Sequence, residues 1–403
     1  MNKKFLRVSF PFIVLSIIGL IGAPCVHADF MIKPFKGSAA ITEGIYYNSN
    51  PGYADVGNRT PSWGNKLGFD LGLELPFGEL HKYSLNSHTE WKKYFDDEAD
   101  EWDAVNTRVS HSLDFTFNKW SLNIHQNFQY SDEPDTAELP VLGRDLLQKT
   151  VNVPGFAIRG DLGKMKLATG FDYTNYRTND AYRILERDVY APWLEVGVQF
   201  TPLLDGFMRY TFTNIDRVTN EMNDSKGYDV KGGLRGELTP YLVGEIAVGY
   251  AYVDYDNTNP PGSPTYGGGD SSDYSGLVYS GSVTNRLSKL TTQTLSFSLA
   301  PEPGYNVGNY YTTYTAGYDI THQLNDKLTI GGLFEYIRSQ ESGGAPRFKE
   351  DSDIWVLGSS FNYKLAKNLS LSAEYKYTEK ESEVKRGKDY KQHAASVGLR
   401  YAF

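Results

Sequence analysis

Along most of this chain, up to its final residue, apolar and polar side chains alternate from one residue to the next. In the closing segment, Leu399, Tyr401 and the terminal Phe403 share one face. Arg400 lies on the other face, so the segment is predicted to be a strand with one apolar and one polar side. A soluble β-sandwich would explain a terminal aromatic residue only if this strand were covered. The other interpretation is the closing strand of an outer-membrane barrel, in which Leu399, Tyr401 and Phe403 form the barrel-closing terminal signal.

The same alternation predicts about eighteen strands, each long enough to cross a membrane at a tilt. They cover residues 37–48, 65–77, 81–95, 103–117, 120–131, 149–161, 165–176, 187–200, 206–216, 225–238, 241–255, 275–287, 290–300, 309–324, 328–339, 351–365, 369–379 and 392–403. Short turns such as 118–119 and 366–368 alternate with longer polar loops such as 132–148 and 256–274. We therefore predict an all-β fold, a transmembrane antiparallel up-and-down β-barrel of about 18 strands with both termini periplasmic.

The first 28 residues predict export. Lys3, Lys4 and Arg7 make a basic start, and an apolar stretch follows at 12–22. This is the pattern of a signal peptide cleaved before Asp29, and its apolar part is too short for a spanning helix with room to tilt. The alternative is an uncleaved N-terminal anchor. We predict that residues 1–28 are a removed signal peptide and that residues 29–403 form a barrel in the outer membrane of a Gram-negative bacterium. The single cysteine lies within residues 1–28, so no disulfide framework remains.

Charge and composition narrow the expected partners. Residues 1–28 hold three of the 40 Lys and Arg and none of the 49 Asp and Glu, so their removal changes the net charge from −9 to about −12. Such a chain has no basic stripe for phosphates, so no nucleic acid is expected. The 30 Tyr, 21 Phe and 39 Gly suit a barrel with aromatic residues at both membrane borders. The expected partners are outer-membrane lipid, lipopolysaccharide and the barrel assembly machinery.

Several sequence runs carry a family resemblance. They are RDVY at 187–190, ELTP at 237–240, VGYAYVDY at 248–255, LSLSAEYKYT at 369–378 and VGLRYAF at 397–403. Together they resemble a family of outer-membrane β-barrel porins associated with exopolysaccharide secretion loci. The resemblance covers residues 185–403 well and the N-terminal half only in style. It implies an integral channel that pairs with a periplasmic polysaccharide-export protein lacking its own membrane span, and it brings no catalytic residues.

The polar faces of the strands line the interior if the apolar faces meet lipid. By parity, the candidate pore-lining residues are Asp70, Glu74, Arg108, Asp114, His125, Glu195, Arg209, Lys231, Arg235, Glu237, Glu245, Glu374, Lys376 and Arg400. Both signs of charge occur, which predicts a hydrophilic pathway for a neutral or mixed-charge solute, with opposed charges setting a transverse field. The alternative is that any wide barrel is polar inside and pairs its charges across adjacent strands. Most aromatic residues fall on the lipid-facing parity. Tyr94, on the polar parity of its strand, is an exception, and the loop tyrosines Tyr53, Tyr266 and Tyr274 could reach the mouth. Interfacial packing is the expected role of each.

Catalysis and metal binding have little support in the sequence. A barrel-wall enzyme needs a nucleophile or water oriented by His and a third polar group. His111 lies between Ser110 and Ser112, but adjacent residues of a strand point to opposite faces, so no dyad forms. The acidic clusters 132–135 and 350–353 lack the spacing of a cation-binding loop and are interpreted as solvated loop charge. We therefore predict no enzyme, no metal site and no cofactor.

Three functions remain. The first is a porin-like channel for exopolysaccharide export, together with a periplasmic polysaccharide-export partner. The alternative is a general or solute-selective diffusion porin, and the third is a barrel that presents loops for adhesion or assembly. An export channel should show little constriction by inward loops, whereas a diffusion porin should have a folded-in loop and should conduct on its own.

Overall fold

The computed structural model describes most of the chain after residue 35. The described residues are 36–52, 60–78, 80–96, 99, 102–133, 147–219, 222–239, 241–256, 270–304, 308–343, 349–383 and 389–403. The predicted signal peptide, residues 1–28, lies outside them and stays a prediction. Within the described ranges, no helix combines the length and the apolar character needed to span a membrane.

Eighteen strands make up the fold. They are β1 (Lys36–Asn48), β2 (Ser62–Phe77), β3 (His81–Tyr94), β4 (Ala104–Phe117), β5 (Trp120–Ser131), β6 (Lys149–Asp161), β7 (Met165–Thr178), β8 (Arg187–Thr201), β9 (Leu204–Arg217), β10 (Ser225–Thr239), β11 (Leu242–Tyr255), β12 (Tyr274–Ser288), β13 (Thr291–Pro303), β14 (Tyr310–Gln323), β15 (Leu328–Glu341), β16 (Asp351–Lys364), β17 (Leu369–Ser382) and β18 (Tyr390–Ala402). A short 3₁₀ helix, η4 (Asp180–Leu185), lies between β7 and β8. Each strand was predicted, and no end differs by more than three residues.

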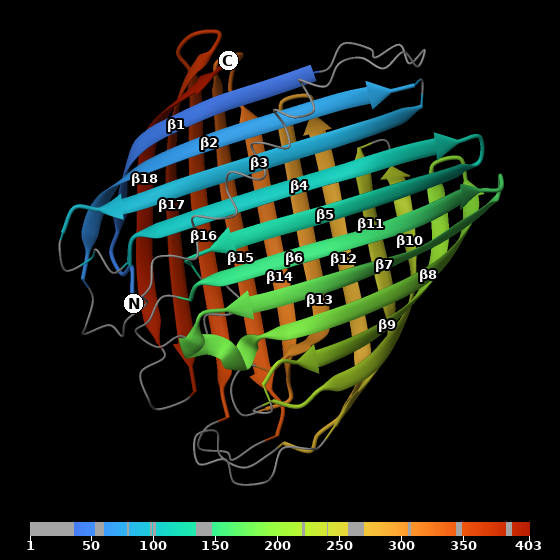
Figure 1. Cartoon of the computed structure of the whole chain (residues 1–403). Helices are drawn as coiled ribbons and strands as arrows, with labels where there is room; N and C mark the ends of the chain where they lie inside the picture. Colours follow the sequence, from blue (N-terminus) through green and yellow to red (C-terminus); the bar gives the residue numbers. More distant parts are fainter. Residues whose placement is uncertain are drawn as a thin grey trace, which may run out of the picture.

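The sheet closes on itself. Every strand pairs antiparallel with its neighbours in sequence, and β1 also pairs with β18, which leaves no open edge among the described strands. At this seam Ile41 lies opposite Tyr401, and the backbone N–H of Phe403 donates to the carbonyl of Ala39 at 2.9 Å. Figure 1 shows β2–β9 crossing in front of β10–β17 around the enclosed space. The predicted all-β antiparallel barrel of eighteen strands is confirmed.

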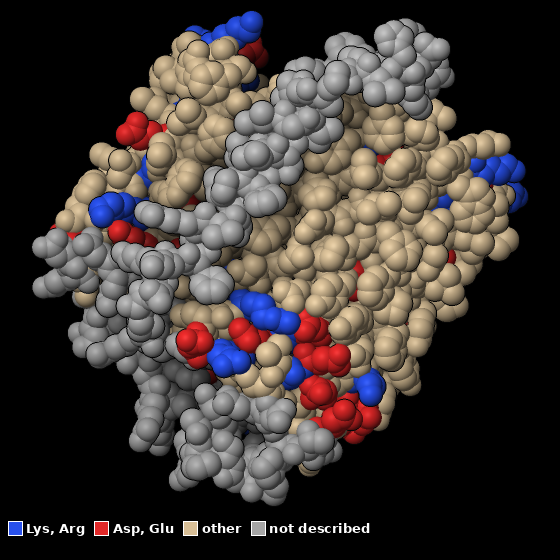
Figure 2. Space-filling view, viewed as in Figure 1, with Lys and Arg blue, Asp and Glu red and all other residues tan. Residues whose placement is uncertain are grey.

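The outer face of this barrel is apolar. Large exposed side chains such as Leu67, Leu194 and Val248 alternate with inward-facing residues along their strands. Figure 2 shows the wall formed by β3–β9 as a mostly uncharged surface, with Lys, Arg, Asp and Glu gathered along its lower edge. In water such a surface would be unfavourable, but it suits hydrocarbon, because the closed ladder leaves few backbone groups without a hydrogen bond.

The two ends of the barrel differ. At one end, called here the short-turn end, connections such as 118–119 and 202–203 join neighbouring strands. The first residue of β1 and the last residue of β18 also lie at this end. The other end, called the long-connection end, holds stretches such as 132–148 and 256–273. This is the predicted alternation of short and long connections. The periplasmic placement of the termini remains a prediction.

Candidate functional site

The strand register shows which predicted residues share the inner face. Directly paired residues lie on one side of a sheet, and Asp70 pairs with His88, which pairs with Arg108. Following the pairs around the closed sheet places fourteen predicted pore-lining residues on this side: Asp70, Glu74, Arg108, Asp114, His125, Glu195, Arg209, Lys231, Arg235, Glu237, Glu245, Glu374, Lys376 and Arg400. The opposite side carries the exposed apolar residues, so the charged side faces the lumen.

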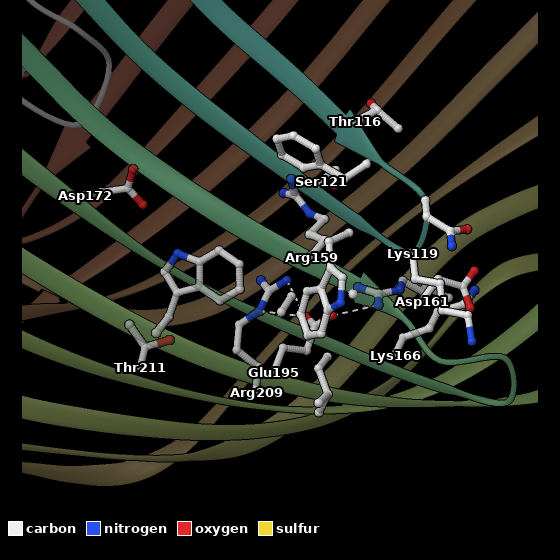
Figure 3. Close-up of a pocket in the computed structure, with 18 residues that line it drawn as sticks. Thr116, Lys119, Ser121, Arg159, Asp161, Lys166, Asp172, Glu195, Arg209 and Thr211 are labelled. Carbon is white, nitrogen blue, oxygen red and sulfur yellow. Dashed lines mark hydrogen bonds and ion pairs between the residues drawn. The ribbon is translucent and has the colours of Figure 1, made fainter. Parts of the chain in front are cut away.

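Three neighbouring strands bring two guanidinium groups onto one carboxylate (Figure 3). Glu195 on β8 accepts hydrogen bonds from Arg209 on β9, with Nη2 at 2.5 Å and Nε at 2.9 Å. Arg235 on β10 approaches the other carboxylate oxygen, with its Nη2 at 2.6 Å. The carboxylate is only 4% exposed, whereas both arginines are partly open to the lumen. Because two positive charges share one negative charge, this part of the wall has an excess of positive charge.

A cavity of about 690 Å³ opens beside this group. Arg159 on β6 and Trp193 on β8 also line it, and the structure records no hydrogen bond or ion pair for Arg159 within the described residues. Lys166 lines it as well and binds Asp205 at 2.6 Å. The parity argument did not single out these residues. Trp193 lies in the run 190–196, which is largely apolar on both faces, so alternation could not identify its side; only its pairing with Thr211 on the inner face does.

The seam has its own charged group on the inner face. His88 Nδ1 lies 2.6 Å from Asp70 Oδ1, and Arg400 Nη2 lies 3.3 Å from Asp70 Oδ2. Arg400 belongs to β18 and Asp70 to β2, so the contact passes over β1, where Ala40 leaves room. Arg108 lines the adjacent cavity of about 540 Å³. The last strand is therefore tied to the second one by charge, across the strand β1 with which both of them pair.

The remaining predicted residues differ in their partners. Lys231 lies 3.7 Å from Asp229, His125 Nε2 lies 2.9 Å from Asp172, and Asp114 accepts a hydrogen bond from Asn123 at 2.6 Å. Among the described residues no ion pair is recorded for Glu74, Arg108, Glu237, Glu245, Glu374 or Lys376. The expectation that charges pair across adjacent strands therefore holds for part of the set.

Charge is also segregated by sector. On β13, β14 and β15 every inward-facing charged side chain is a carboxylate: Glu302, Asp319, Glu335 and Glu341. Their inward neighbours are mainly Ser, Thr and Gly. The guanidinium groups around Glu195 lie in a different sector, on β6–β10. The inner wall is therefore acidic on β13–β15 and of mixed sign on β6–β10, where carboxylates such as Asp172, Asp205 and Asp229 accompany the guanidinium groups.

The long-connection end is bridged by apolar side chains, called here the mouth cluster. It contains Leu147, Tyr176, Tyr182, Ile184, Leu185, Met222 and Tyr311, all buried. Tyr182, Ile184 and Leu185 come from η4, which Thr178 holds by donating its hydroxyl to the Tyr182 carbonyl at 2.7 Å. Tyr311 comes from the inner face of β14, five strands beyond β9. The β7–β8 connection therefore packs against a distant part of the wall.

Hydrogen bonds reinforce this bridge through Asn223, Asp270, Asn309 and Ser342, called here the mouth network. Asn223 donates to the Asn309 side chain at 2.8 Å, and Asp270 accepts from the Asn309 backbone N–H at 2.9 Å and from Ser342 at 2.5 Å. Burial by itself raises the pKa of Asp270, but these hydrogen bonds and that of Ser272 hold it below the ordinary value of an aspartate. Four different connections are therefore joined, with the acceptor ionised at neutral pH.

Two residues of the acidic clusters, Asp132 and Glu350, are buried, so the interpretation as solvated loop charge was wrong for them. Glu350 is fully buried and binds Lys380 at 2.6 Å, and Glu133 binds Lys92 at 2.7 Å. Asp132 is buried too, and burial raises its pKa. Asp135 lies outside the described residues. These carboxylates hold connections against strands, because a buried charge needs a partner.

Neither Tyr94 nor Tyr274 forms an aromatic platform in the lumen. Tyr94 is buried in a cluster with Tyr46 and Ala99, and Tyr274 packs against Tyr310 with ring centroids 5.3 Å apart. Tyr53 and Tyr266 lie outside the described residues. Within the described ranges, no three His, Cys, Asp or Glu side chains converge as a metal site.

A family model described as "Putative beta-barrel porin 2" matches residues 28–403. The chain belongs to this porin family. Porins are channels of the outer membrane, and the match indicates no enzymatic family. The resemblance to outer-membrane β-barrel porins is thereby confirmed, and this porin is an outer-membrane barrel channel.

Solved structures similar to this porin include an outer membrane protein and a BenF-like porin. OpdK from Pseudomonas aeruginosa has 10% identity and a TM-score of 0.47, with 92% of this porin and 99% of OpdK covered. A BenF-like porin from Pseudomonas fluorescens Pf-5 has 11% identity and a TM-score of 0.48, with 92% and 100% covered. OccK8 (OprE) from Pseudomonas aeruginosa has 13% identity and a TM-score of 0.48, with 92% and 98% covered. No curated protein matches this porin in sequence.

Proposed function

We propose that this porin is a passive diffusion channel for small polar solutes. The observation that supports this most strongly is the bridged mouth, in which η4 and Met222 pack against Tyr311 from a distant strand. The resemblance led us to expect exopolysaccharide export, and an export channel should show little constriction by inward connections. The folded-in connection instead favours the diffusion porin that was the alternative.

A polymer would have to break this bridge to pass through it. The mouth cluster is apolar and buried, and the mouth network fixes four connections with hydrogen bonds. Opening them would expose apolar surface at about 25 cal/mol for each Å² and would leave buried polar groups without partners. Small solutes need only the space that the bridge leaves open, so no such opening is required of them.

The inner wall supports a preference among these solutes. More cationic than acidic side chains line one cavity: Lys119, Arg159, Lys166, Arg209 and Arg235 against Asp161, Asp172 and Glu195. Two unit charges 4 Å apart interact by about 1 kcal/mol in bulk water and by about 4 kcal/mol near a protein surface. We propose that an anionic solute binds here transiently and passes more readily than a cationic solute of the same size. The fourteen inward residues would then line the pathway.

The orientation and partners belong to the same proposal. Residues 1–28 would be removed on export, both termini would face the periplasm, and the assembly machinery would insert the barrel among outer-membrane lipid and lipopolysaccharide. Passive diffusion requires no periplasmic polysaccharide-export protein. Presentation of loops for adhesion is less favoured, because the described connections are tied into the mouth.

Flux through purified protein tests this function. The barrel would be reconstituted into liposomes, and swelling would be measured with uncharged sugars of increasing size and with an anionic and a cationic solute of matched size. We expect uptake of monosaccharides, a sharp loss of uptake for longer oligosaccharides, and faster uptake of the anion. Uptake of long polysaccharide, or loss of surface polysaccharide on deletion of the gene, would favour export instead.

A further inference from the structure

The outer face of β4, β5 and β6 carries three hydrogen-bonded polar side chains, two midway along β4 and β5 and one three residues from the start of β6. His111 Nε2 lies 3.0 Å from Gln126 Oε1, and Gln126 Nε2 donates to Asn152 Oδ1 at 2.7 Å. We call these residues the outer polar trio. By register they share the face of Phe128 and Phe156 rather than that of the lumen. Hydrocarbon offers no hydrogen bond to the donor and acceptor atoms of the trio that are not bonded within it.

Outward-facing charged side chains lie mostly elsewhere. Arg177, Asp188 and Lys391, for example, lie at strand ends beside the long connections, where water and lipid head groups are within reach. Glu43 does not follow this pattern, because it faces outward midway along β1. Three adjacent strands contribute to the trio, and Asn152 lies opposite the outward-facing Asn175 on β7, which donates to Asp188 at 2.8 Å. Within the described residues, no hydrogen bond is recorded for Asn152 Nδ2 or His111 Nδ1, so donor and acceptor capacity remains.

Two prolines weaken the ladder in the same part of the wall. Pro154 on β6 lies opposite Gln126, and the pairing of β6 with β7 omits residues 153–154. Pro192 on β8 likewise falls where the pairing of β8 with β9 omits residues 191–192. Proline lacks the N–H that a central strand donates, so it is usually confined to edges and bulges. A defect of this kind is costly when it faces lipid.

An apolar groove lies beside the trio and the first proline. It has a volume of about 560 Å³ and is lined by Ile124, Pro154, Phe156, Phe171, Tyr173 and Tyr190, with little polar surface. These side chains come from the outer faces of β5 to β8. Figure 2 looks onto this wall and shows it largely free of charge. The groove has room for protruding apolar side chains of another surface.

We propose that this patch is the contact between two copies of this porin. A lipid chain could fill the groove, but it could not bond to the carboxamides of Gln126 and Asn152. A second copy can do both, because a carboxamide is donor and acceptor at once, and the same patch on two subunits is self-complementary about a two-fold axis. Polar side chains that bond across an interface are a recognised means of association in membranes. This inference is independent of the solute that passes.

Site-specific photo-crosslinking in cells tests the contact. The photoreactive residue p-benzoylphenylalanine would replace Phe156, which is 40% exposed in the groove, or Leu295, which is 50% exposed on the outer face of β13. Two copies with different epitope tags would be expressed together. We expect a product of twice the monomer mass carrying both tags from Phe156 and none from Leu295. A product with lipopolysaccharide or another protein, equal yields at both positions, or no product would overturn the proposal.

Replacement of the outer polar trio is the second test of the proposed contact. The triple variant His111→Leu, Gln126→Leu, Asn152→Leu should keep a heat-modifiable barrel and lose at least about tenfold in crosslink yield, equivalent to about 1.4 kcal/mol. Gln293→Leu, an outward-facing glutamine on β13, is the matched control and should leave the yield unchanged. Gln126→Leu alone would be used if the triple variant does not assemble, and a wild-type yield from a folded variant would contradict the proposal.

Discussion

Arg209 Nη2 and Glu195 Oε2 lie 2.5 Å apart on neighbouring strands, and Arg235 approaches the other oxygen of the same carboxylate at 2.6 Å. The acid orients both guanidinium groups and cancels one of their two charges. Removing the negative charge should therefore increase the positive potential of the lumen.

Glu195→Gln should raise the ratio of anion to cation permeability. We expect a rise of at least about twofold, a small part of the ~1–4 kcal/mol that one charge contributes at contact distance. The reversal potential across a planar bilayer in a potassium chloride gradient measures it. Glu374→Gln, a carboxylate with no recorded ion pair on β17, is the matched control and should have a smaller effect. A ratio that falls, or the same change in both variants, would refute the assignment.

Tyr311→Ala should widen the mouth. Tyr311 is buried against η4 in the mouth cluster. Truncating a large buried aromatic side chain costs about 3–5 kcal/mol, and here the loss should weaken the packing of η4 against β14. Single-channel recordings should show a higher and noisier conductance in a barrel that still migrates as folded. Tyr314→Ala, an outward-facing residue of the same strand, should conduct like the wild type. An unchanged conductance for Tyr311→Ala would mean that the bridge does not limit flow.

Lys380→Met should destabilise the barrel by about 3–5 kcal/mol, because Glu350 would keep a buried charge without its partner. The double variant Glu350→Gln, Lys380→Met should recover much of this loss. Lys391→Met removes a far more exposed partner of Glu379 and should cost much less stability, because solvent screens an exposed ion pair. Urea unfolding in detergent measures all three, and equal losses for Lys380→Met and Lys391→Met would contradict the reasoning.

Deletion of Phe403, or Phe403→Asp, should lower the amount of folded barrel in outer-membrane fractions. The ring is 71% exposed and touches Tyr401 at a centroid distance of 5.1 Å, so it adds little to the stability of the finished barrel. We therefore expect a defect in assembly in cells and a nearly normal unfolding midpoint after refolding in detergent. Heat-modifiable migration on gels measures the level in cells. Wild-type levels would show that the terminal residue is not an assembly signal.

The strands could be predicted from sequence because a barrel wall repeats one physical rule. Each strand must be apolar toward lipid and polar toward the lumen, so alternation locates both its ends and its faces. The inward side chains of Glu195, Arg209 and Arg235 follow from parity alone. Their convergence on one carboxylate does not, because it depends on the register between strands.

The mouth could not be predicted, because the connections obey no such rule. Tyr182, Ile184 and Leu185 lie between two strands, and nothing in their order shows that they pack against Tyr311. Glu350 appeared to be solvated for the same reason, since its partner Lys380 is 30 residues away on another strand. Long-range contacts of connections are set by tertiary packing, and packing is not periodic.

Conductance of the purified porin alone is the most direct test of the central claim. The protein would be refolded in detergent, added to a planar lipid bilayer without any other protein, and recorded in potassium chloride. A diffusion porin with a bridged but open mouth should give discrete, persistent channel openings that Tyr311→Ala enlarges. A correctly folded barrel that stays closed until a periplasmic polysaccharide-export protein is added would contradict this account.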